Sequence, residues 1–237
     1  MWLTRNRLSL NVSKTFAMNF SKRSVDEDQN VSLMMGGRAV DFNSVGIYLG
    51  IGIDKELSFA HHVGQVCDKM SKIVGIMYKI SHIAPRDILL RIYYSMIYPY
   101  LTYCLVVWGG AATVHTNKIL LLQKRVVRII TGSEYTEHSE PLFRLLGILK
   151  INDLYKYVCC LYGFKNINCF HTAEHYHYTR NRSLLVPEYH RLTTTQRSLS
   201  FVVPHFINGL PSQIRECNSL STFKHSIIQH ILDGYSD

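Results

Sequence analysis

The apolar side chains change their spacing near residue 59, and this change constrains the fold more than any other feature. After it, they recur every three or four residues on one stripe, formed by Phe59, Val63, Val66, Met70, Ile73, Met77 and Ile80. That period predicts a long amphipathic helix. Before it, apolar residues form short runs separated by turn residues, which predicts strands. We therefore expect an α+β chain, with a small antiparallel β region followed by a mostly helical remainder.

The β region contains one hairpin signal and one further strand signal. Gly36-Gly37 separates β-type runs at residues 31–35 and 38–42, and a two-residue glycine turn between such runs predicts a hairpin. Residues 45–53 form another β-rich run, which ends at Asp54-Lys55. The polar residues 26–30 are typical of a solvated loop.

Two more helices should follow the first, and three neighbouring amphipathic helices predict a small bundle. Pro85 can open the second helix at its first position, and Pro99 should end or kink it. The third helix should start at an N-cap residue, Thr116 or Asn117, and end before Gly132. Its expected apolar face consists of Ile119, Leu122, Val126 and Ile129.

The chain beyond Gly132 should contain further helices around one long loop. Ser139 can cap a short helix that ends near Leu146. Asn152 or Asp153 can cap a longer helix, whose expected apolar face is Leu154, Val158, Leu161 and Phe164. Residues 168–200 lack a clear period and predict a loop or linker, and a last helix should begin near Ser219 or Ser221.

Positive charge predominates, with 26 Lys and Arg against 17 Asp and Glu in 237 residues, a net charge of +9. This excess predicts a polyanionic partner, most simply RNA or DNA. The expected helix at residues 115–131 contains no acid and carries Lys118, Lys124, Arg125 and Arg128. Solvated helices normally mix both signs, so contact with a nucleic-acid backbone is favoured over an ordinary solvated face.

Two other segments carry unbalanced positive charge. Residues 1–24, which include Arg5, Arg7 and Lys14, also contain no acid. Residues 178–201 interleave arginines, including Arg180, with aromatic residues. This second pattern suits single-stranded nucleic acid, whose bases stack on aromatic rings. A linker of ordinary composition is the slightly favoured alternative.

Several chemistries lack their motifs. No phosphate-binding loop is present, and Cys160 and Cys169 are too far apart for a zinc-ligand pair, so no metal site is expected. The six scattered cysteines predict reduced, buried thiols, with Cys159 and Cys160 in a helix core. There is no secretory segment, and the longest apolar stretch is too short to span a membrane. We expect an intracellular protein, nuclear or cytoplasmic, with no membrane partner and no small-molecule cofactor.

Four stretches in fixed order carry a family resemblance. The first contains Asn6-Arg7-Leu8-Ser9-Leu10-Asn11-Val12-Ser13-Lys14-Thr15, and the second begins Tyr48-Leu49-Gly50-Ile51. The third runs from Tyr98-Pro99-Tyr100-Leu101 to Gln123-Lys124-Arg125, and the fourth joins Tyr178-Thr179-Arg180 to Asn208-x-Leu210-Pro211 and Ser219-x-x-x-Phe223-Lys224. Together they resemble the later part of a reverse transcriptase, an RNA-directed DNA polymerase, from a jockey-like non-LTR retrotransposon.

The resemblance implies a role for each part of the chain. The first stretch is similar to motif D, in which Lys14 would protonate the leaving pyrophosphate of an intact enzyme. Tyr48, Leu49 and Gly50 would form the primer-grip turn of motif E, and a buried strand with a bulge is the alternative for these residues. Residues 1–55 would be a palm remnant, residues 56–135 a thumb-like helical bundle, and residues 136–237 a C-terminal helical and loop region.

The resemblance also implies that part of the enzyme is missing. In the family, a catalytic Asp and an aromatic-Ala-Asp-Asp motif lie upstream of motif D, and Met1 falls just before motif D. The Mg²⁺ ions of an intact enzyme would then lack their carboxylates here, so we expect no cofactor and no polymerase activity from the chain alone.

Three hypotheses follow from the sequence. The chain is a truncated reverse transcriptase that keeps the part binding the primer–template backbone, with the missing upstream half as a possible partner. Alternatively, it is a basic nucleic-acid-binding module, or an inert and poorly folded transposon remnant whose first 55 residues have lost their sheet partners.

Overall fold

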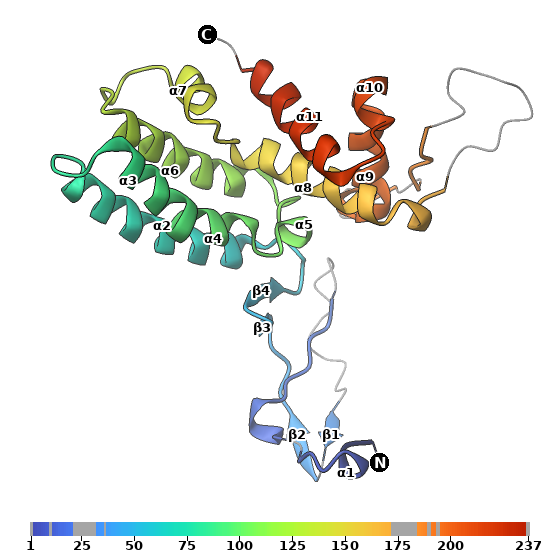
Figure 1. The fold of residues 1–237 in the computed structure, drawn as a ribbon. Coiled ribbons are helices and arrows are strands. Elements are labelled where there is room, and N and C mark those ends of the chain that lie inside the picture. The colour runs from blue at the N-terminus through green and yellow to red at the C-terminus, as the bar shows by residue number, and fades with distance from the viewer. Residues whose placement is uncertain are drawn as a thin grey trace, which may run out of the picture. The chain divides into compact units, whose positions relative to one another are not determined.

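The computed structural model describes residues 2–9, 11–20, 32–35, 37–171, 184–188, 191–192 and 195–235. The contacts between residues divide the chain into two units, Met1–His62 and Val63–Asp237. Figure 1 shows small antiparallel strand pairs in the first unit and helices in the second. The expected α+β class is confirmed.

The first unit begins with short helical segments and a hairpin. These segments are α1 (Trp2–Arg5) and the 3₁₀ turn η1 (Val12–Lys14). Strands β1 (Leu33–Met35) and β2 (Arg38–Val40) pair antiparallel, with Met35 opposite Arg38. This register confirms the hairpin predicted from Gly36-Gly37, and Gly37 has the positive φ of +78° that such a turn needs.

The β-rich run at residues 45–53 is a second hairpin, so a single continuous strand is excluded, and its turn lies where the resemblance places the motif E turn. Strands β3 (Val45–Tyr48) and β4 (Ile51–Asp54) pair antiparallel with Tyr48 opposite Ile51. Leu49 and Gly50 between them have φ of +47° and +79°, the left-handed pair of a tight hairpin turn. The alternative of a buried strand with a bulge is also excluded, because Tyr48, Leu49 and Gly50 are exposed.

Asp54 ends this hairpin and prepares the first long helix. Its carboxylate accepts hydrogen bonds from the backbone N–H groups of Ser58 at 2.9 Å and Phe59 at 2.7 Å, and from the Ser58 hydroxyl at 3.1 Å. The Ser58 hydroxyl in turn accepts from the Ala60 N–H at 3.2 Å, which is one of the donors that a helix start leaves unpaired. Helix α2 (Ala60–Ile80) then confirms the predicted helix, with Val63, Val66, Met70, Ile73 and Met77 buried on one stripe.

The predicted second helix is present, but Pro99 does not end it. It comprises α3 (Arg86–Ile92), a π-helical segment η2 (Tyr93–Ile97) and α4 (Tyr98–Thr102). Proline lacks an N–H and would break regular α-helical pairing, whereas here the Tyr98 N–H bonds to the Tyr93 carbonyl five residues back. The wider π turn absorbs the defect. Pro85 precedes the helix as its N-cap residue instead of occupying its first position.

The third predicted helix begins earlier than its expected cap. After α5 (Leu105–Trp108) and the Gly109-Gly110 break, α6 (Thr113–Thr131) starts behind Ala112, so the Thr116 and Asn117 N-cap predictions were wrong. Gly132 ends it at φ +71°, as predicted. The buried stripe is Thr116, Ile119, Gln123, Val126, Val127 and Ile130, while the predicted core residues Leu122 and Ile129 are only half-buried.

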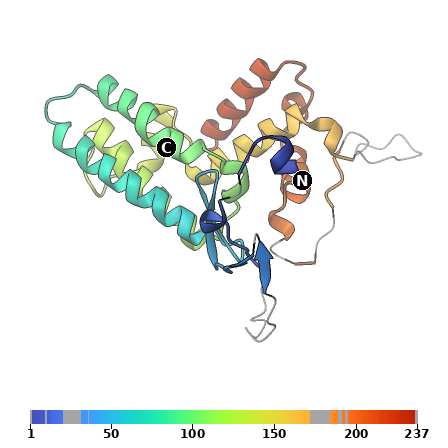
Figure 2. The same cartoon turned by 90° about the horizontal axis from the view of Figure 1, so that it is seen from below.

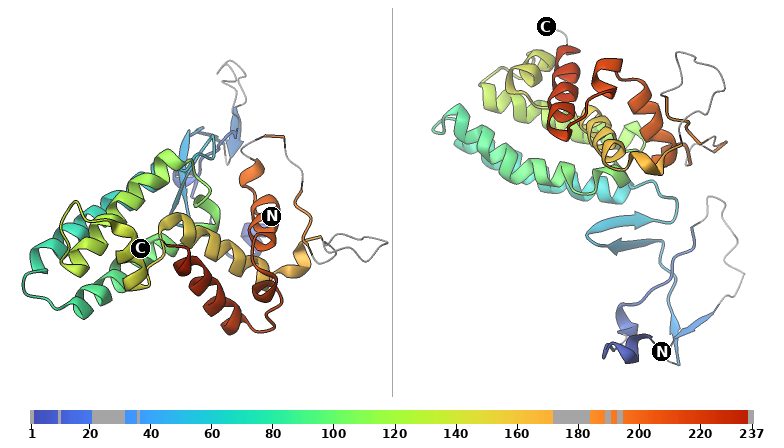
Figure 3. Two further views of the ribbon diagram at one scale, coloured as in Figure 1. Left: turned by 90° about the horizontal axis from the view of Figure 1, so that it is seen from above. Right: turned by 45° about the vertical axis from the view of Figure 1, so that its right-hand side comes forward.

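Gln123 explains this rotation of α6. Its side chain is fully buried, and its amide donates to the Leu149 carbonyl at 3.1 Å and accepts from the Ile151 N–H at 2.8 Å. Buried polar groups are stable only when they are paired, so α6 must turn this amide toward the chain between α7 (Ser139–Leu146) and α8 (Ile151–Lys165). Figures 2 and 3 show α6 beside α2 and α3, with α8 crossing the middle of the helical unit.

The remaining helices pack around α8. They are α9 (Leu199–Asn208), which the sequence did not predict, α10 (Ser212–Arg215) and α11 (Leu220–Asp233), which begins behind the predicted cap Ser219. Gly163 lets α9 approach α8 closely, because a Cβ there would lie 2.4 Å from a Val203 methyl. Phe164 stacks on Phe223 of α11 with ring centroids 4.4 Å apart.

About half of the long loop predicted at residues 168–200 lies outside the described residues. Its described parts include the 3₁₀ turns η3 (Ile167–Cys169) and η4 (Thr195–Arg197). The backbone of Leu185 is also anchored, because the Asn208 side chain donates to its carbonyl at 2.7 Å and accepts from its N–H at 3.0 Å.

We predict that Gln123→Met destabilises the helical unit by about 2–4 kcal/mol, because it keeps the shape but leaves two buried backbone groups unpaired. Chemical denaturation measures this change. The same substitution at Gln229, an exposed residue of α11, is the matched control and should change the free energy of unfolding by less than about 0.5 kcal/mol. Equal effects of the two substitutions would contradict the assignment.

Candidate nucleic-acid interface

Helix α6 presents a basic stripe opposite its buried stripe. Lys118, Leu121, Arg125 and Arg128 follow one another at helical spacings of three and four, and Leu122 lies next to Leu121. Lys118 and Arg125 are exposed, and Leu121 is 62% exposed. Because Gln123 fixes the opposite side in the core, the positive charges of this stripe must face outward.

The basic stripe lines a groove of about 720 Å³, which we call the basic groove. Its lining residues are Cys67 of α2, Lys118, Leu121, Leu122, Lys124, Arg125 and Arg128 of α6, and Tyr135 of the following loop. None of these described residues is acidic. The structure thus brings all four predicted basic residues of α6 into one concave surface. An acid-free groove of this kind favours a polyanion.

The four cations are not equivalent. Arg128 donates from Nε and from a terminal nitrogen to the Glu137 carbonyl, at 3.0 and 2.7 Å, and its guanidinium lies 5.8 Å from the centre of the Tyr135 ring. It therefore holds the loop after α6 in place. Among the described residues, the ion pair that involves Glu140 is formed with Lys150 and not with a cation of the groove. Lys118, Lys124 and Arg125 remain available to an anionic ligand.

The thiol of Cys67 reports the electrostatics of the basic groove. Burial raises the pKa of Cys67, the positive charge of Lys118 opposes this rise, and the negative charge of Asp68 adds to it. The ammonium of Lys118 is thus close enough to influence a thiol of α2. Cys67 is the residue of α2 that lines the basic groove together with the residues of α6.

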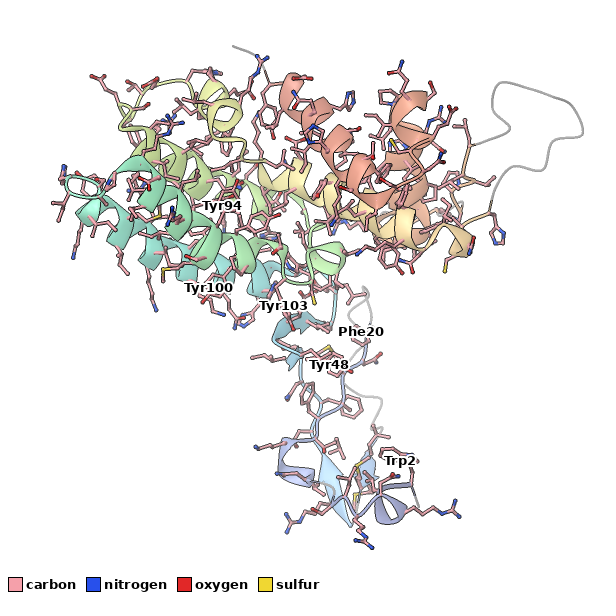
Figure 4. The ribbon with its side chains drawn as sticks, viewed as in Figure 1. Trp2, Phe20, Tyr48, Tyr94, Tyr100 and Tyr103 are labelled. Carbon is pink, nitrogen blue, oxygen red and sulfur yellow. The ribbon has the colours of Figure 1, made fainter. Side chains whose placement is uncertain are left out.

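The other predicted site residues lie in the first unit or outside the described residues. Arg5 and Lys14 lie on exposed positions of α1 and η1, and Arg7 is exposed with φ of +55°. Tyr48, Leu49 and Gly50 form the turn of the β3–β4 hairpin, and Figure 4 labels Tyr48 there. Their nucleic-acid roles stay predictions. Arg180 lies outside the described residues.

The prediction of buried thiols holds for only part of the set. All six cysteines are free, and Cys159 and Cys160 are buried in α8 as expected. Cys104 and Cys169 are exposed, so the prediction was wrong for them. Cys104 precedes α5 and has a left-handed φ of +49°. It is therefore not part of the helix, and the helical spacing that would bury it does not apply to it.

The described residues offer neither a metal-binding cluster nor a membrane-spanning helix. Within the described part of the chain, no group of three or more His, Cys, Asp or Glu side chains could hold a metal ion. No helix among the same residues combines the length and the apolar character that a membrane span requires.

Sequence reasoning missed the aromatic residues beside the basic groove. Tyr135 lines the groove itself, and Tyr78 lies on the neighbouring face of α2. Further along the unit, the Lys69 ammonium lies 5.1 Å from the ring centre of Tyr100, which Figure 4 labels with Tyr94 and Tyr103. No sequence signal marks Tyr78, because its place beside α6 depends on how the two helices pack.

Comparison with known proteins identifies the relatives of this chain. This chain is 31% identical over 157 residues to the RNA-directed DNA polymerase from mobile element jockey of Drosophila melanogaster. The chain is related to the RNA-directed DNA polymerases of jockey-type mobile elements. The corresponding jockey protein of Drosophila funebris is 26% identical over 159 residues, and a probable RNA-directed DNA polymerase from transposon BS of Drosophila melanogaster is 26% identical over 156 residues.

The relationship to the jockey-type polymerases covers parts of both proteins. Each of these three alignments includes 64% of this chain and 17% of its relative, so the matched part is about a sixth of the length of those relatives. No family model matches the chain, and no solved structure matches it. The resemblance inferred from the ordered motifs is confirmed.

We predict that an alkylating reagent at pH 7.5 modifies Cys67 several-fold more slowly than the exposed Cys104, because a raised pKa leaves less reactive thiolate. Lys118→Gln should slow Cys67 further, since it removes the charge that lowers this pKa. Peptide mass spectrometry measures both rates, with Lys165→Gln on α8 as the charge-matched control. An unchanged Cys67 rate in Lys118→Gln would contradict the electrostatic contact.

Proposed function

We propose that the helical unit binds the sugar–phosphate backbone of a primer–template duplex through the basic groove. The observation that carries this proposal is the acid-free stripe of α6, which leaves Lys118, Lys124 and Arg125 without an ion pair to any described carboxylate. The relatives supply the class of ligand, since RNA-directed DNA polymerases act on such duplexes. On this proposal, residues 56–135 act as a thumb-like bundle.

The spacing of the cations suits contacts with one strand. Lys118 and Arg125 are seven residues apart, which places them ~10 Å apart along the helix axis. A nucleic-acid strand carries one phosphate per ~3.4 Å of helix axis, so these two side chains can reach phosphates about three nucleotides apart. Such contacts fix the position of the duplex without reading its sequence.

A separate contact with nucleic acid is proposed for the first unit. The exposed turn at Tyr48, Leu49 and Gly50 is the proposed primer grip, because Gly50 carries no side chain that would keep a strand at a distance. Residues 1–55 would then be the palm remnant, and Lys14 would act in proton transfer only within an intact enzyme. Residues 136–237 would support the thumb through the packing of α8 on α6.

We infer that the chain does not polymerise by itself. Two-metal phosphoryl transfer needs converging carboxylates, and the motifs that this chain resembles are those that follow such carboxylates in the family. No catalytic step is therefore assigned to this chain. Incorporation of deoxynucleotides by the purified chain with Mg²⁺ would overturn this inference without affecting the binding proposal.

We predict that the chain binds an RNA–DNA hybrid with a strong salt dependence, because cations that contact phosphates release condensed counterions. Fluorescence anisotropy between about 50 and 200 mM salt should give a plot of log affinity against log salt with a slope of about −3 or steeper. The triple variant Lys118→Gln, Lys124→Gln, Arg125→Gln should reduce the magnitude of this slope by about 2–3.

The control for this experiment removes the same number of charges elsewhere in the helical unit. Lys156→Gln, Lys165→Gln and Lys224→Gln, on α8 and α11, should leave the slope within about 1 of the original. Equal losses in the two triple variants would show that net charge and not the groove binds nucleic acid. A slope near zero in the unmodified chain would favour an inert remnant.

A further inference from the structure

A second hollow lies next to the basic groove. It encloses about 510 Å³ between the C-terminal half of α2 and the end of α6. We call it the aromatic pocket, and its principal lining residues are Ser71, Gly75, Tyr78, His82, Ile129 and Tyr135. It shares Arg125, Arg128 and Tyr135 with the basic groove. A strand held in the groove therefore has direct access to the pocket.

The pocket is open where a base would enter. A Cβ at Gly75 would meet nothing within 4 Å, so the α2 wall is recessed at this residue. Gly132 ends α6 with φ of +71°, and Gly132 and Tyr135 both line the pocket. The volume lies within the range of known small-molecule sites and is ample for one nucleobase with its sugar.

Each of the two tyrosine rings contacts one neighbouring side chain and is otherwise exposed to solvent. Tyr78 is 62% exposed and makes an edge contact with His82, at 6.2 Å between ring centres and 72° between planes. Tyr135 is 79% exposed and lies near the Arg128 guanidinium, which the Glu137 carbonyl fixes in turn. Positioned, solvent-exposed rings are the surfaces on which unpaired bases stack.

The charge around the pocket selects among aromatic ligands. Arg125 and Arg128 border it, and none of its described lining residues is acidic. A neutral apolar ligand or an apolar peptide segment would gain nothing from these cations. A nucleotide presents an aromatic face and an anionic backbone together, which matches both features.

We propose that the aromatic pocket stacks an unpaired nucleobase of a strand whose backbone lies in the basic groove. This proposal rests on the proposed function, and it adds a second ligand class, single-stranded RNA or DNA next to a duplex. Arg128 is a positioning residue in this arrangement, because it orients Tyr135 while Arg125 remains free to contact phosphate.

The test compares two hybrids that differ only in a three-nucleotide single-stranded overhang, made once as RNA and once as DNA. The unmodified chain should bind the overhang hybrid at least about fivefold more tightly than the blunt hybrid, since each stacked base adds to affinity. Tyr78→Leu, at a ring that lines the aromatic pocket and not the basic groove, should lose most of this advantage and bind the blunt hybrid as before. Tyr78→Phe should keep the advantage, because it retains the ring.

The outcomes separate this proposal from the proposed function. Blunt binding without any overhang advantage, or an advantage that persists in full in the Tyr78→Leu variant, would overturn the aromatic pocket and leave the basic groove intact. If the unmodified chain binds neither hybrid, both proposals are overturned. Tyr162→Leu, an exposed tyrosine of α8 outside both hollows, is the matched control and should preserve the advantage.

Discussion

The buried amide of Gln123 determines how the helical unit faces its surroundings. Its two hydrogen bonds, to the backbone of Leu149 and Ile151, can form at only one rotation of α6 about its axis. At that rotation the apolar residues Ile119, Val126 and Ile130 enter the core. The basic side of the helix then has no alternative but solvent or a ligand. A single satisfied polar group thus sets the register of the helix and the position of its charges.

Local patterns predicted the elements whose residues carry their own signals. The stripe of α2, the Gly36-Gly37 hairpin, the Gly132 helix end and the Ser219 cap were visible because period, turn chemistry and capping are local properties. The register of α6 was not, because a glutamine in an apolar stripe shows no sign of the distant backbone groups that it pairs with. The β3–β4 turn was expected from the resemblance and not from local turn chemistry, since Leu49 is unusual at positive φ.

The candidate site shows the same division. The basic residues of α6 were evident from the sequence because their helix contains no acid, and the structure gathers them in one groove. The contribution of α2, through Cys67 to the groove and Tyr78 to the pocket, depends on how two helices pack and could not be foreseen. The relatives are polymerases, yet the aligned region is a small part of their length. The proposed function of this chain therefore depends on the basic groove and the aromatic pocket.

The central claim is that phosphates contact the outward face of α6, and lysine footprinting tests it most directly. Acetylation of lysines in the full chain, with and without an RNA–DNA hybrid, is followed by peptide mass spectrometry. The account predicts that the hybrid protects Lys118 and Lys124 while Lys165 and Lys224 react at the same rate as before. Equal protection of all four lysines, or protection confined to Lys165 and Lys224, would contradict it.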